Sequence, residues 1–83
     1  MEIYLLIARS VTHAQRMVRI LESCGVRTGM FRAPTGLAAR GCSYSVRVRE
    51  DQLLQARSCL EKADLQPLGI FVRDGNGYRE VVM

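Results

Sequence analysis

The sequence predicts an α+β fold: a ferredoxin-like βαββαβ sandwich with an extra C-terminal edge strand. Strand-like and helix-like apolar spacings alternate along the 83 residues. A faint internal repeat also relates the two halves, and two such βαβ halves form this sandwich. We therefore expect an antiparallel sheet of order 4-1-3-2 with both helices on one face. At a shift of forty positions, the matching residues are Tyr4 and Tyr44, Arg9 and Arg49, Gln15 and Gln55, Ile20 and Leu60, Gly29 and Gly69, and Phe31 and Phe71.

The first half is expected to form a strand, a helix and a second strand. Ile3–Ala8 is a nearly continuous apolar run, which is typical of a strand in the middle of a sheet. The helix begins after Thr12, which fits a capping box, or after Ser10 as the competing cap. The second strand covers Val26–Arg32, and Pro34 helps to end it because proline cannot donate to a ladder. The apolar face of the helix comprises Ala14, Met17, Val18 and Leu21.

The second half repeats this order and adds a hairpin. A Gly- and Ala-rich connector over 33–41 leads to an alternating strand, Ser43–Arg49, with Tyr44, Val46 and Val48 on one side. A helix follows, started by the acidic pair Glu50-Asp51, and its buried stripe is Leu53, Ala56, Leu60 and Ala63. The hairpin over 68–83 should place its last strand at the sheet edge. The whole chain, 1–83, is expected to be a single domain.

Composition and local sequence argue against nucleic-acid binding, membrane insertion and histidine catalysis. The net charge is +4, but the arginines are scattered, and the third strand lacks the aromatic pair of RNA-recognition domains, so nucleic acid is an unlikely partner. No apolar run could span a membrane, and the N-terminus does not resemble a secretory signal, so we expect a cytoplasmic protein. His13, the single histidine, has no catalytic companion and is expected at the surface.

The three cysteines show neither CxxC nor metal-ligand spacing, which argues against a disulfide framework and against a metal site. Cys24 and Cys59 are expected to be core or boundary residues of the helices. Cys42 differs from them because it follows Arg40 and Gly41 on the connector. A thiolate is the form that attacks or carries sulfur, and the guanidinium groups of Arg40 and Arg47 would favour it. The alternative is a buried, inert Cys42.

The stretch YLLIARSVTHAQRMVRILESCGV, a proline-led connector, and Cys42 ahead of a strand with Arg47 resemble a known family. It is the selenium/sulfur (Se/S) carrier protein-like family of small bacterial domains of unknown function. The likeness covers about Ile3 to Phe71, although this chain reads Gly-Cys where the family pattern has Cys-Gly. The resemblance implies a carrier role through Cys42.

Two functions follow as hypotheses. In the first, the protein is a non-catalytic carrier without cofactor or metal, whose partners are sulfur or selenium donor and acceptor proteins. Cys42 would hold the atom as a persulfide or its selenium equivalent, with Arg40, Gly41 and Arg47 in support. In the second, it is a regulatory or assembly module that binds a small ligand or a protein. A homodimer through a sheet edge or the open sheet face is compatible with either hypothesis.

Overall fold

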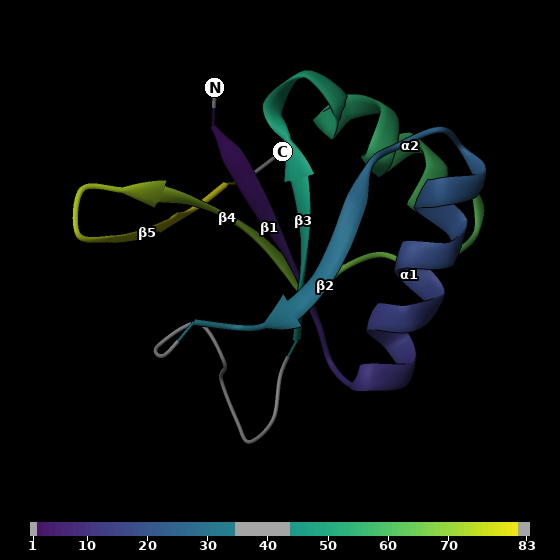
Figure 1. Ribbon diagram of the computed structural model, residues 1–83, viewed down its shortest axis with the longest axis horizontal. Coiled ribbons are helices and arrows are strands. Elements are labelled where there is room, and N and C mark those ends of the chain that lie inside the picture. Colours follow the sequence, from purple (N-terminus) through teal and green to yellow (C-terminus); the bar gives the residue numbers. More distant parts are fainter. Residues whose placement is uncertain (1, 35–43, 82–83) are drawn as a thin grey trace.

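The computed structural model describes residues 2–34 and 44–81. It confirms the α+β class, with two α-helices and five strands among these residues (Figure 1). The elements in chain order are β1 (Ile3–Ala8), α1 (Val11–Ser23), β2 (Thr28–Arg32), β3 (Tyr44–Arg49), the short 3-10 helix η1 (Glu50–Gln52), α2 (Leu53–Lys62), β4 (Gly69–Asp74) and β5 (Gly77–Glu80).

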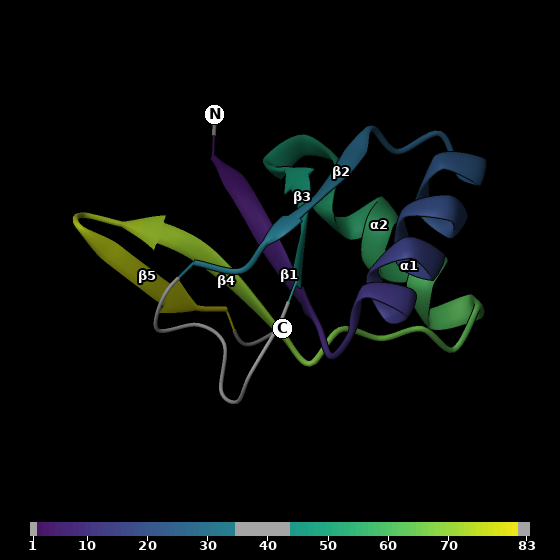
Figure 2. The same ribbon diagram turned by 60° about the horizontal axis from the view of Figure 1, so that its bottom comes forward.

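The five strands form one antiparallel sheet in the order β2-β3-β1-β4-β5. This differs from a bare 4-1-3-2 sheet because β5 pairs beside β4 and adds a fifth strand at the edge. Read from the opposite edge, the order is β5-β4-β1-β3-β2. Both helices cover the same face of the sheet, and the β4–β5 hairpin projects away from them (Figures 1 and 2).

The core lies between the sheet and the helices. Leu6 of β1 is directly opposite Val46 of β3, and both are fully buried. Because strand residues alternate between faces, every second residue of each central strand points toward the helices. The predicted inward set of β3 is therefore confirmed. The helices contribute Ala14, Met17, Leu21, Leu53, Ala56, Cys59 and Leu60 to this core.

Helix α1 is capped at both ends by local hydrogen bonds. The Ser10 hydroxyl accepts a bond from the backbone N–H of His13 at 3.1 Å, so Ser10 is the N-cap and Thr12 is not. At the other end Gly25 has φ +80°, which glycine adopts without a Cβ penalty. The backbone N–H of Val26 then bonds to the Leu21 carbonyl at 2.9 Å, a Schellman-type ending.

A disulfide joins Cys24 at the end of α1 to Cys59 of α2, with their Cα atoms 6.6 Å apart. Cys59 is in the core and Cys24 packs against it, as expected. The prediction that was wrong is the argument from cysteine count and spacing against a disulfide. Their pairing depends on how the helices pack, and a spacing of 35 residues does not reveal it. The C-terminal end of α1 is also held to the first turn of α2 by Gln55, whose side-chain amide donates to the Cys24 carbonyl at 2.7 Å.

His13 is buried in the first turn of α1, with 6% of its surface exposed, which contradicts the expected surface position. Its Nδ1 accepts a hydrogen bond from the Arg9 backbone N–H at 3.2 Å, which places the proton of the neutral ring on Nε2. Nε2 is buried without a partner among the described residues. Burial, followed by the nearby charges of Arg9 and Arg16, lowers the pKa of His13 below its ordinary 6.5.

We expect removal of the disulfide to destabilise the protein by about 2–4 kcal/mol, because the bond closes a long loop in the unfolded chain. Urea unfolding of Cys24→Ser and Cys59→Ser should show similar losses. Reductant should lower the urea midpoint of unfolding equally in the wild type and in the Cys42→Ser variant, because both keep the Cys24–Cys59 bond. An alkylated mass showing three free thiols in the unreduced protein would contradict the bond.

The lowered pKa of His13 predicts that stability falls on mild acidification. The unfolded chain takes up the imidazole proton at higher pH than the folded protein, so unfolding is favoured as pH drops below about 6.5. NMR titration of the single histidine should give a midpoint below 6.5. A His13→Gln variant should lose less stability between about pH 7 and 5.5 than the wild type. A midpoint at or above 6.5 would refute the buried neutral ring.

Candidate functional site

Three of the four predicted site residues, Arg40, Gly41 and Cys42, lie outside the described residues. The fourth, Arg47, lies on β3, the strand that follows them in the chain. The described chain stops at Pro34 and resumes at Tyr44, the cross-strand partner of Arg32. The geometry around Arg47 is therefore the part of the predicted site that can be built.

Arg47 is exposed on the sheet face opposite the helices, as expected. Its guanidinium carbon lies 3.9 Å from the centroid of the Phe31 ring, a cation–π contact that links β3 to β2. Ser45, on the same face, is 1% exposed, and its hydroxyl donates to the Phe31 carbonyl at 3.3 Å. Phe71 of β4 also lies on this face, because its cross-strand partner Leu5 is the partner of Arg47 as well.

A pocket of about 380 Å³ opens on this face, and Arg47 is part of its wall. We call it the open-face pocket. Three of its lining residues, Ile3, Leu5 and Tyr78, supply apolar surface, whereas Arg47, Arg73 and Glu2 supply charge. The remaining lining residues are Pro34, Ser45 and Val72. The pocket thus joins both central strands to the edge hairpin.

The electrostatics of the open-face pocket favour an anion. Two arginines and one glutamate line it, which leaves an excess of one positive charge. Neither Arg47 nor Arg73 forms an ion pair among the described residues. By contrast, Arg49 pairs with Asp51 at 3.2 Å, and Arg79 pairs with Asp74 at 3.5 Å. The two lining guanidinium groups therefore keep donors available for another acceptor.

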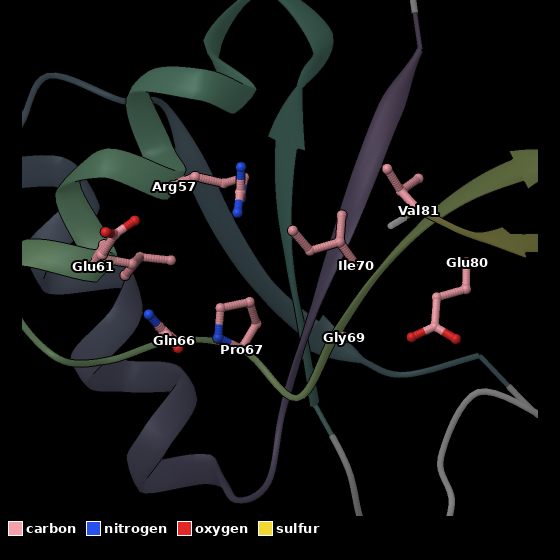
Figure 3. A pocket seen from close by; sticks show the side chains of 9 residues that line it. Arg57, Glu61, Gln66, Pro67, Gly69, Ile70, Glu80 and Val81 are labelled. Atoms are coloured by element: carbon pink, nitrogen blue, oxygen red, sulfur yellow. The ribbon is translucent and has the colours of Figure 1, made fainter. Parts of the chain in front are cut away.

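A second cavity, of about 220 Å³, lies between α2 and the segment that enters β4 (Figure 3). Arg57 and Glu61 extend from α2, Gln66 and Pro67 lie below them, and Glu80 lies on the opposite side, at the hairpin. Its volume is below that of most small-molecule sites, and its charges are mixed. It contains none of the predicted site residues. The open-face pocket is the stronger candidate.

Within residues 2–34 and 44–81, no group of three or more His, Cys, Asp or Glu side chains could hold a metal ion. No helix in this part of the chain is long and apolar enough to cross a membrane.

Sequence reasoning missed the contribution of the C-terminal hairpin to this pocket. The family resemblance ends near Phe71, yet Arg73 and Tyr78, which follow it, are cross-strand partners and both line the pocket. Strand alternation in the sequence could have predicted this contribution, because it places Arg73 of β4 on the same face as Phe71. The tight turn at Gly75, where φ is +64°, then returns Tyr78 to lie opposite Arg73.

Comparison with known proteins gives one match. A model of the family described as "Putative Se/S carrier protein-like" matches residues 3–72, which include all of β1 to β3 and both helices. Searches of curated proteins and of solved structures give no significant match. Because the family model covers most of the sequence, the chain belongs to the Se/S carrier protein-like family.

Proposed function

We propose that the protein is a sulfur or selenium carrier that holds the chalcogen on the Cys42 thiolate and passes it to a partner protein. The observation that carries this proposal is the disulfide. Two of the three cysteines, Cys24 and Cys59, are bonded to each other. Cys42 is the third cysteine and takes no part in this bond. The family to which the chain belongs is named for carrying selenium or sulfur.

The position of the disulfide supports a division of roles among the cysteines. Cys24 lies at the C-terminal end of α1, whereas Tyr44 pairs with Ala8, just before the N-terminal end of that helix. A helix of 13 residues is about 20 Å long. The disulfide therefore lies at the other end of α1 from the strand end at Tyr44. In this proposal the disulfide stabilises the packing of the helices, and Cys42 carries the chalcogen.

The transfer needs only exchange at sulfur. The Cys42 thiolate attacks the outer sulfur of a donor protein's persulfide, a new S–S bond forms, and the donor's thiolate leaves. An acceptor thiolate then attacks the terminal sulfur on Cys42 and releases the Cys42 thiolate, so no net oxidant is consumed. A selenium atom would follow the same route. Arg40 and Arg47 would favour the anionic forms, and Gly41 would let the partner approach.

The rival function is a regulatory or assembly module with an inert Cys42. The open-face pocket favours it, because the pocket offers about 380 Å³ and two arginines to a ligand. Native-state alkylation separates the two, since a carrier thiol must react readily and an inert one must not. Sedimentation at several concentrations tests for a homodimer. The cytoplasmic location stays a prediction. It is tested by lysing cells directly into denaturant with an alkylating reagent, because a reducing cytosol would leave Cys24 and Cys59 as thiols that become modified.

We expect incubation with a cysteine desulfurase and cysteine to add the mass of one sulfur atom per chain, mapped by peptide mass spectrometry to Cys42. The Cys42→Ser variant should gain none, and Cys24→Ser with Cys59→Ser should load as the wild type does. Arg47→Gln should load more slowly, and Arg79→Gln is its matched control, because Arg79 pairs with Asp74. Sulfur found on Cys24 or Cys59 with Cys42 unmodified would overturn the carrier proposal.

A further inference from the structure

The geometry points to a ligand site in the open-face pocket: a small organic acid with an apolar body, bound through its acid group by Arg47 and Arg73. This inference goes beyond the carrier function and does not rest on Cys42. It rests on a fixed guanidinium, a second one nearby, an apolar surface between the strands, and a cavity of suitable size.

The first element is a preorganised arginine. The guanidinium carbon of Arg47 lies over the Phe31 ring, 3.9 Å from its centroid. This cation–π contact occupies no hydrogen-bond acceptor, so the guanidinium N–H groups stay available for a planar acceptor such as a carboxylate. Because the ring already restrains the side chain, less conformational entropy is lost on binding.

Gly29 makes this stack possible. It is the cross-strand partner of Arg47, so a side chain there would occupy the space beside Arg47. The Phe31 ring fills this space instead: a Cβ on Gly29 would lie 3.0 Å from its Cε2 and 3.4 Å from its Cζ. Gly29 is therefore a positioning residue, which acts on the ligand through Phe31 and Arg47.

The internal repeat supplies a natural comparison. Gly69 and Phe71 on β4 repeat the arrangement, with the Phe71 ring 3.2 Å from a Cβ placed on Gly69. The cross-strand partner of Gly69 is Ile7, whereas that of Gly29 is Arg47. Among the described residues the Phe31 ring alone carries a stacked arginine. The two halves thus share the glycine–phenylalanine pair, but among the described residues an arginine lies over the phenylalanine ring at Phe31 and not at Phe71.

The rest of the pocket fits an apolar body. Leu5 and Ile3 present aliphatic surface from β1, and Tyr78 adds an aromatic ring that is 39% exposed. The volume of about 380 Å³ lies within the range of small-molecule pockets. A concave site of this size favours a small molecule over an acidic peptide, which would need a longer groove. The excess positive charge favours an acid over an amine or an alcohol.

The test uses hexanoate as the probe and compares it with hexan-1-ol and inorganic phosphate. Binding of each is measured by the change in backbone amide chemical shifts in NMR. Hexanoate should shift the resonances of Leu5, Ser45 and Arg73 in a saturable way. Hexan-1-ol should bind about tenfold more weakly, since it lacks the charge-assisted bonds. Phosphate should also bind more weakly, since it lacks the apolar body. Tighter binding of either comparison, or of an acidic peptide, would overturn the assignment.

Variants locate the site. Arg47→Gln and Arg73→Gln should each weaken hexanoate about tenfold, whereas Arg79→Gln, on the same hairpin, should not. Gly29→Ala should weaken binding and Gly69→Ala should not. Both arginine changes are at exposed positions and keep the fold testable if a glycine variant unfolds. Unchanged affinity in Arg47→Gln, or shifts confined to the cavity near Arg57, would refute the site. Cys42→Ser should bind normally, which separates this result from the carrier test.

Discussion

The antiparallel pairing of β1 with β3 is the constraint on which both sides of the molecule depend. It places Leu6 opposite Val46 under the helices and Leu5 opposite Arg47 on the other face. A slip of one residue would exchange these faces, burying an arginine and exposing valines, so the hydrophobic pattern fixes the register. The core and the open-face pocket are therefore two consequences of one alignment.

Much of the architecture is readable from local patterns. Alternation in β3, the apolar run of β1 and the Gly-rich turn before β5 predict their elements because each depends on a few neighbouring residues. The repeat of Gly29-x-Phe31 at Gly69-x-Phe71 also carries through, as equivalent pairs on β2 and β4.

The features that sequence reasoning missed are tertiary. The bond between Cys24 and Cys59 requires α1 and α2 to bring Cα atoms within 6.6 Å, and no spacing rule encodes that distance. His13 is buried in the first turn of α1, and its Nδ1 accepts a hydrogen bond from the backbone N–H of Arg9, which precedes the helix. Neither the burial nor the contact has a signal in the local sequence pattern. Of the predicted thiol site, Arg47 is described, and two residues that line the pocket with it, Arg73 and Tyr78, lie beyond the family match.

The two proposals give each part of the molecule a separate task. The helix layer with its disulfide would provide stability, the open sheet face would bind the ligand, and Cys42 would transfer the chalcogen. The most direct measurement of this account is a single-turnover chase. Protein loaded with radiolabelled sulfur is mixed with an acceptor thiol while the Cys24–Cys59 bond stays intact. The account predicts that one labelled atom per chain moves to the acceptor and that Cys42 is again a free thiol. Label that stays on the protein, or never loads, would contradict it.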